Sequence, residues 1–214
     1  MRTDELINTL VADHAAQPGP KPVGHGLVMA IIGGLAISYA LFSLTLGVRP
    51  DFISALGTWR YDMKLGVNLV LMIAATWVAL RLSRPTATPL TAMRALMAPV
   101  FLLLAAVLYE LVTVSASEWP SRAMGVNGVM CVASILFLSL LPLTATIYAL
   151  RQGAPTSPAV MGAVGGLLAG SLGATVFAMH CTNDSPLFVA IWYALAIGLM
   201  SIFGLLVGKR ALRW

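Results

Sequence analysis

Two cysteines and a histidine are the side chains of this sequence that are best suited to redox or metal chemistry. Cys131 and Cys181 are the chain's two cysteines, and His180 directly precedes the second. A pair of thiols can form a disulfide, and thiolates together with an imidazole bind soft metal ions. The spacing contains no CxxC motif, so it supports a metal site or an oxidoreductase only weakly. A third interpretation also stays open, in which the two cysteines are small apolar residues buried separately.

One carboxylate, Glu110, falls inside a long apolar run of the sequence. An acid within the membrane is costly and is therefore a candidate functional group. Because Glu110 lies near one end of its run, we expect it to reach the membrane interface or to pair with an arginine such as Arg122, rather than to relay protons. The sequence contains no GxSxG, HExxH or P-loop pattern. We therefore expect a protein that is not an enzyme.

The composition identifies the kind of structure that must position these groups. Of the 214 residues, 59% are apolar and 10% are charged, whereas soluble domains carry about 25% charged residues. Runs of about 20 apolar residues cross a bilayer as helices. The sequence predicts an all-α integral membrane protein whose six spans form one bundle within residues 26–208. The runs are 27–48, 65–80, 95–115, 125–150, 158–179 and 187–207.

The second run is short, and we expect it to extend through Met63 or Leu82. Lys64 and Arg81 would then snorkel to the membrane interface. In the fifth run, Gly162, Gly166 and Gly170 form a stripe of small residues suited to close helix packing. The sixth run offers Ala190, Ala194 and Gly198 at the same spacing. We interpret both stripes as contact seams, and Ser157 and Ser185 as N-caps before Pro158 and Pro186.

The basic residues predict the orientation of the chain in the membrane. Most of the 13 lysines and arginines fall in the N-terminal segment, the second and fourth loops and the tail 209–214. Basic loops stay in the cytoplasm, so both termini are expected there, in the bacterial inner membrane. Cys131 and Cys181 then lie near the outer face, where disulfides are permitted. The charge of +5 follows from this topology and gives no support to nucleic-acid binding.

The N-terminal segment, residues 1–25, is expected to be cytoplasmic, with a short helix over about 3–13 followed by a linker. Its apolar side chains Leu6, Ile7, Leu10 and Val11 form a stripe on one face. So short a helix must dock on something to be stable in water. Its polar side is acidic, which favours a protein partner over a lipid surface. We expect no cleavable signal peptide, because the first residues are acidic and the first apolar run starts late.

The sequence resembles the NrsF-type bacterial inner-membrane anti-sigma factors. The resemblance covers essentially the whole chain. It rests on the opening MRTDELI, the six spans and the two cysteines, and on the stretch in which His180-Cys181 precedes Asp184-Ser185-Pro186 and Trp192-Tyr193. The family implies that an extracytoplasmic-function sigma factor is held at the membrane and released under heavy-metal or oxidative stress. Cys131 and Cys181 would be the sensor, able to bind a soft metal ion transiently, and His180 and Asp184 its accessories.

Two functional hypotheses follow. In the first, Leu6, Ile7, Leu10 and Val11 dock in a groove of the sigma factor, and a change at the cysteines alters the packing of spans four and five. In the second, the chain is a small transporter or channel for a metal ion or other solute. Its path would then contain the cysteines, His180 and Glu110. Flux measured in liposomes distinguishes the two.

Overall fold

The computed structural model describes residues 2–16, 23–84 and 89–213, and this part of the chain is helical without strands. The predicted linker residues 17–22 lie outside the described residues, as does part of the second loop. The elements are α1 (Thr3–Ala16), α2 (Val23–Thr45), α3 (Phe52–Ala55), α4 (Trp59–Leu82), α5 (Pro89–Met93), η1 (Arg94–Leu96), α6 (Met97–Thr113), η2 (Ala116–Glu118), α7 (Trp119–Met124), α8 (Gly128–Leu150), α9 (Pro158–Phe177), α10 (Pro186–Phe188), the π-helical turn η3 (Val189–Tyr193) and α11 (Ala194–Ala211).

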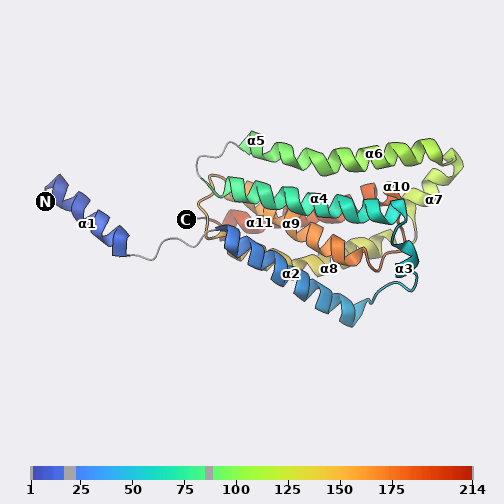
Figure 1. Cartoon of the computed structure of the whole chain (residues 1–214), viewed down its shortest axis with the longest axis horizontal. Coiled ribbons are helices and arrows are strands. Elements are labelled where there is room, and N and C mark those ends of the chain that lie inside the picture. The colour runs from blue at the N-terminus through green and yellow to red at the C-terminus, as the bar shows by residue number, and fades with distance from the viewer. Residues whose placement is uncertain (1, 17–22, 85–88, 214) are drawn as a thin grey trace.

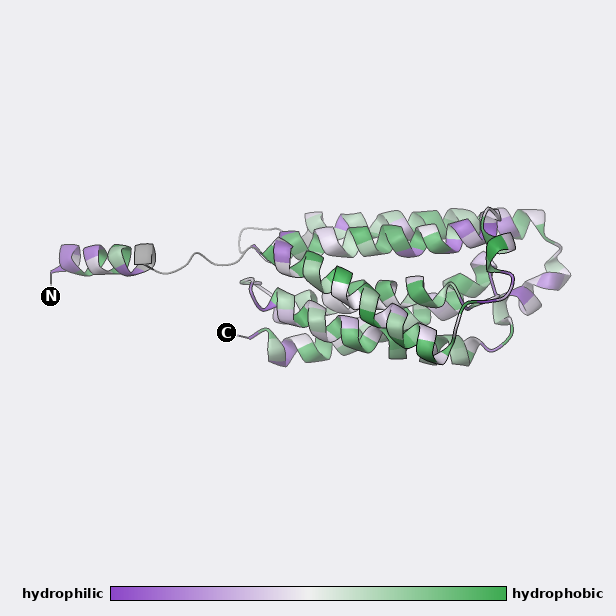
Figure 2. Cartoon of the chain, turned by 60° about the horizontal axis from the view of Figure 1, so that its bottom comes forward, coloured by the Kyte–Doolittle hydropathy of each residue, from purple (hydrophilic) through white to green (hydrophobic). Residues whose placement is uncertain are grey.

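Six helical segments are long and apolar enough to cross a membrane, which confirms the predicted fold class. They are Val23–Thr45, Trp59–Leu82, Thr91–Thr113, Gly128–Leu150, Pro158–Phe177 and Pro186–Ala211. Their side chains are apolar along most of their length, and hydrophilic residues gather near the ends of the bundle and on α1 (Figure 2). The second span does extend beyond its apolar run, from Trp59 to Leu82.

The six spans run alternately up and down, so that their connections gather at two ends of the bundle (Figure 1). The connections 46–58, 114–127 and 178–185 lie at one end, which we call the cysteine end. The start of α2 and the end of α11 lie at the opposite end. The central helix is α9, which contacts α11, α8, α4 and α2 and buries most of its residues.

The contact between α9 and α11 is a close approach of two backbones. A Cβ atom placed on Gly208 would lie 2.6 Å from the Cα atom of Gly162, and one on Gly166 would lie 2.7 Å from the Cα atom of Ser201. Glycine is therefore required here, and the predicted seam of the fifth span is confirmed. The seam predicted for the sixth span is wrong, because a Cβ atom placed on Gly198 would meet no atom within 4 Å. Gly204 and Gly208 of α11 meet α9 instead.

Helix α6 lies at the edge of the bundle beside α4 (Figure 1) and is the least buried of the spans. Helix α1 is also unburied, since the side chains of residues 2–13 are all exposed. The predicted apolar stripe of α1 is 42% exposed at Leu6 and 62% exposed at Val11. This stripe is therefore free of cover by the described part of the chain.

Candidate functional site

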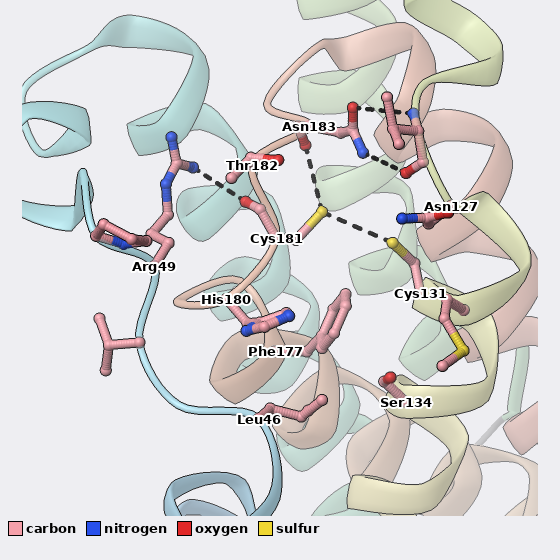
Figure 3. Close-up of a pocket in the computed structure, with 14 residues that line it drawn as sticks. Leu46, Arg49, Asn127, Cys131, Ser134, Phe177, His180, Cys181, Thr182 and Asn183 are labelled. Carbon is pink, nitrogen blue, oxygen red and sulfur yellow. Dashed lines mark hydrogen bonds between the residues drawn. The ribbon is translucent and has the colours of Figure 1, made fainter.

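The two cysteines meet at the cysteine end of the bundle (Figure 3). Cys131 lies one turn into α8, and Cys181 lies in the loop 178–185, which we call the thiol loop. Their Sγ atoms are 3.8 Å apart, and both side chains are free and buried. A disulfide has an S–S distance of about 2.05 Å, so the two sulfurs are in contact but must move closer to be joined. The interpretation of two separately buried cysteines is wrong.

A cavity of about 430 Å³ adjoins both thiols. Its lining includes polar side chains from three loops and from α8, as well as the two sulfurs (Figure 3). These polar residues are Arg49, Asn127, Ser134, His180, Thr182 and Asn183. The volume is larger than a metal ion needs, so a small reagent can be accommodated beside the sulfurs.

The thiol loop is fixed to the loops on either side of it. The backbone N–H of Arg49 donates to the carbonyl of Met179 at 3.0 Å, and Nδ1 of His180 lies 2.9 Å from the carbonyl oxygen of Gly47. On the other side, Nδ2 of Asn183 donates to the carbonyl of Val126 at 2.8 Å. The position of Cys181 is therefore set jointly by the segment after α2 and the segment before α8.

Two cations from outside the thiol loop, Arg49 and Lys64, bind the carboxylate of Asp184 within it. We call these three residues the charged clamp. Lys64, from α4, pairs with one carboxylate oxygen of Asp184, and Arg49 pairs with the other at 2.8 Å. Both cations also donate to the carbonyl of Cys181, at 2.9 Å from Lys64 Nζ and 3.0 Å from Arg49 Nη1. The side chain of Lys64 has no exposed surface. The expectation that Lys64 snorkels to the interface is therefore wrong, because the acceptors of the thiol loop lie within its reach.

Arg49 also binds Asp51 through two hydrogen bonds, of 2.8 Å from Nε and 2.7 Å from Nη2. The hydrogen bond from Arg49 lowers the pKa of the Asp51 carboxyl to about 2. The same contact raises the pKa of the Arg49 guanidinium, although burial acts against it. A two-pronged arginine–carboxylate pair of this kind fixes orientation as well as charge. Arg49 is therefore presented to the thiol loop in one defined geometry.

A second polar cluster anchors α6 next to the thiol loop. The fully buried carboxylate of Glu110 accepts hydrogen bonds from Arg60 at 3.1 Å and from Arg122 at 3.4 Å. It also accepts from the hydroxyl of Ser185 at 2.6 Å and from the backbone of Leu187 at 3.3 Å. Of the two structural expectations for Glu110, the pairing with Arg122 is confirmed, and the reach to the interface is wrong because the side chain is fully buried. Ser185 and Ser157 both lie at the expected N-cap positions before proline. The Ser157 hydroxyl caps α9 by accepting from the backbone of Val160, whereas the Ser185 hydroxyl bonds Glu110 and makes no capping hydrogen bond.

The two sulfurs are electrostatically unequal. The pKa of the Cys181 thiol is lowered below its ordinary value, first because a hydrogen bond from the Cys131 thiol would stabilise the thiolate form of Cys181. Burial opposes this shift, and the positive charge of Lys64 supports it. Since the thiolate is the reactive form of cysteine, Cys181 is the better nucleophile of the pair.

The structure brings together some of the predicted site residues and separates others. Asp184 belongs to the charged clamp that holds the backbone of Cys181. His180 is engaged by Gly47 and packs on the ring of Phe177 at 5.8 Å. Among the residues that the structure describes, no group of three or more His, Cys, Asp or Glu side chains is arranged to hold a metal ion. The two thiols could therefore supply two ligands to a metal ion, and no third ligand of these residue types lies beside them in the described part of the chain.

Lys64 and Arg49 belong to the site but could not be assigned to it from the sequence. Arg49 lies just beyond the first span, and Lys64 lies near the start of the second, where basic residues are ordinary interface anchors. The only sign in the sequence that Lys64 belongs to the site is its position beside an apolar run. It becomes informative only when its acceptors, which are more than 100 residues away in sequence, are known.

Comparisons with known proteins agree over nearly the whole chain. The family model described as "NrsF: Negative regulator of sigma F" matches residues 10–214. The chain is 31% identical over 214 residues to the "Probable anti-sigma-F factor NrsF" of Azospira oryzae, and all of both chains is covered. It is 31% identical over 216 residues to the "Anti-sigma-F factor NrsF" of Caulobacter vibrioides, again with both chains fully covered. No solved structure matches the chain.

Proposed function

The chain belongs to the NrsF family of negative regulators of sigma F, and we propose that it holds an extracytoplasmic-function sigma factor at the bacterial inner membrane. It is a multi-pass membrane protein and a regulator rather than an enzyme. We propose further that modification of Cys131 and Cys181 by heavy-metal or oxidative stress releases the sigma factor. The contact of two free thiols, 3.8 Å apart beside a cavity, is the observation that carries this proposal.

The proposed topology places α1 in the cytoplasm and the cysteine end toward the periplasm. Most of the basic residues lie at the end of the bundle where α2 starts and α11 ends, which fits the retention of positive charge in the cytoplasm. A sigma factor is cytoplasmic, and the periplasm permits disulfides. The proposed sensor and the proposed binding segment would then lie on opposite sides of the membrane.

The docking element in this proposal is the apolar stripe of α1. Leu6, Ile7, Leu10 and Val11 are exposed on an amphipathic helix of 14 residues with acids in its first turn. An amphipathic helix that lies in a hydrophobic groove of a partner is a recurrent mode of recognition. Binding of α1 would cover the sigma-factor surface that RNA polymerase needs.

The energy required for release is modest. A tenfold change in sigma-factor affinity corresponds to about 1.4 kcal/mol of differential stabilisation between two states of the bundle. A disulfide contributes about 2–4 kcal/mol in typical proteins, and soft metal ions bind thiolates strongly. Either event at the cysteine pair is therefore large enough.

The test is a reporter of sigma-dependent transcription in cells that carry the wild-type chain or Cys131→Ser/Cys181→Ser. We expect the double variant to lose the response to cadmium or diamide while the protein still inserts in the membrane. Ser134→Ala, a change at a polar residue of the same cavity, serves as the control and should respond normally. A double variant that responds like the wild type would show that the thiols only fill space.

A further inference from the structure

Lys64 is a buried cation whose three donors are all committed to the thiol loop. Its Nζ atom donates to the carbonyls of Cys181 at 2.9 Å and Asn183 at 3.4 Å and pairs with Asp184. An ammonium group has three N–H donors, so these contacts satisfy all of them. Every acceptor lies within four residues of sequence, between 181 and 184.

The surroundings of this ammonium group hold it in one place. Nζ lies 5.3 Å from the ring centroid of Tyr61 and 5.9 Å from that of Tyr193, both of which are buried. The adjacent Asn68 amide donates back to the carbonyl of Lys64 at 2.9 Å. A desolvated charge in such a setting is stable only while its partners stay in place. The position of Lys64 and the conformation of the thiol loop therefore depend on each other.

We propose that Lys64 is the positioning residue that keeps Cys181 opposite Cys131. Cys131 is fixed by α8, whereas Cys181 lies in an irregular segment and needs external contacts to hold its sulfur at 3.8 Å. Arg49 shares Asp184 and the Cys181 carbonyl with Lys64, but it approaches from a loop, while Lys64 is part of a membrane-spanning helix. This role bears on sensing only if the proposed function is right, but the geometry does not depend on it.

The first experiment measures how well the thiol loop protects Cys181 in the purified full-length protein. In the Cys131→Ser background, N-ethylmaleimide should label Cys181 faster when the thiol loop opens, because the side chain is buried in the closed loop. We expect Lys64→Met, which keeps the length of the side chain and removes its charge, to speed labelling about tenfold or more. Lys64→Arg, which keeps charge and donors, should restore slow labelling. Lys209→Met, at an exposed lysine of α11, is the control for loss of charge and should change nothing.

A second probe separates local opening from general loosening of the bundle. Ala169, fully buried in α9, is replaced by cysteine in a chain that lacks both natural cysteines. We expect Lys64→Met to leave the labelling of A169C unchanged. An equal increase at A169C would overturn the proposal, because Lys64 would then support the fold as a whole. Unchanged labelling of Cys181 would overturn it as well.

The third measurement is disulfide formation by diamide in the chain with both cysteines. The two thiols lose two protons and two electrons and an S–S bond forms, while the N=N group of diamide takes up both electrons and both protons and becomes an HN–NH group. We expect Lys64→Met to slow this reaction although Cys181 has become more accessible, because the sulfurs are no longer held together. Faster disulfide formation in the variant would contradict a positioning role.

Asp184→Asn keeps the inference testable if Lys64→Met does not insert in the membrane. This change weakens the acceptor that Lys64 and Arg49 share, so we expect the same selective labelling of Cys181 with A169C still protected. Protection of Cys181 in Asp184→Asn would overturn the proposal. None of these assays contains a sigma factor. Failure of the transcription reporter would therefore count against the proposed function and leave the role of Lys64 standing.

Discussion

The hydroxyl of Ser185 donates a 2.6 Å hydrogen bond to the buried carboxylate of Glu110. This contact joins the end of the thiol loop to α6, the span with the least buried surface. The same carboxylate binds Arg60 of α4 and Arg122 of α7. Glu110 thus connects four segments of the cysteine end, and its lone pairs are occupied by structural donors. This arrangement favours an anchoring role over a place on a solute path.

Glu110→Gln is expected to destabilise the protein by about 1–3 kcal/mol. Removing one partner of a fully buried ion pair costs about 3–5 kcal/mol, and the lower figure reflects the partial exposure of Arg60 and Arg122, near 30%. Thermal unfolding of the detergent-solubilised protein measures the change. Ser117→Ala, at an exposed serine outside this cluster, should leave the melting temperature unchanged. Equal melting temperatures for Glu110→Gln and the wild type would contradict the anchoring role.

The seam between α9 and α11 predicts a difference between two glycines of α11. Gly204→Ala should destabilise the bundle by about 1–3 kcal/mol, because its methyl group would meet the backbone of α9. Gly198→Ala is the matched control, since its methyl group would meet no atom within 4 Å, and alanine favours helix formation. Retention of heat-treated protein in solution compares the two. Similar losses in both variants would argue against the seam.

The hydrogen bond between the two thiols predicts how the reactivity of Cys181 depends on pH. Cys131→Ala removes the donor that lowers the pKa of Cys181, so that pKa should rise and the thiolate fraction at neutral pH should fall. Cys131→Ser keeps a donor and should preserve the lower value. The midpoint of the alkylation rate against pH, measured with iodoacetamide, reports the pKa of Cys181. The same midpoint in both variants would show that this hydrogen bond does not control it.

The exposed stripe of α1 predicts the effect of charge on sigma-factor binding. Leu6→Asp/Leu10→Asp should abolish co-purification of the sigma factor from membranes, because two charges would have to be buried in an apolar groove. Stability of the bundle should not change, since both side chains are exposed. Asn8→Asp adds a negative charge to the same helix outside the stripe and should retain binding. Loss of binding in Asn8→Asp as well would point to charge rather than to apolar docking.

The spans could be predicted from the sequence because each follows from a local run of apolar residues. The pairing of Glu110 with Arg122 could also be anticipated, because a buried acid needs a cation and the two lie 12 residues apart. The sequence could not decide whether Cys131 and Cys181 are in contact or are buried separately. It depends on where an irregular loop folds, and that loop is fixed by partners as distant as Gly47 and Val126.

Lys64 and Ser185 depart from their expected settings for a common physical reason. Lys64 was expected at the interface, and the hydroxyl of the N-cap residue Ser185 was expected to bond the backbone of its helix, because each residue type prefers those local contacts. In the structure, both side chains instead bind groups that are distant in sequence, and the stronger charged partners prevail. The position of the seam on α11 was missed for a similar reason. Two stripes of small residues on one helix look alike until the rotation of its neighbour is known.

The close approach of α9 and α11 divides the bundle into parts with different freedom to move. Two helices whose backbones touch through glycines cannot slide or rotate past each other without collision, so they travel as a single rigid body. A displacement that starts at Cys181 would then fall on the segments that contact the thiol loop. These are the connection after α2 through Arg49, α4 through Lys64, α6 through Glu110 and the start of α8 through Cys131. Of these helices, α2 is the one that follows α1 in the chain. The rigidity of one helix pair would thus direct mechanical strain toward the segment that we propose binds the sigma factor.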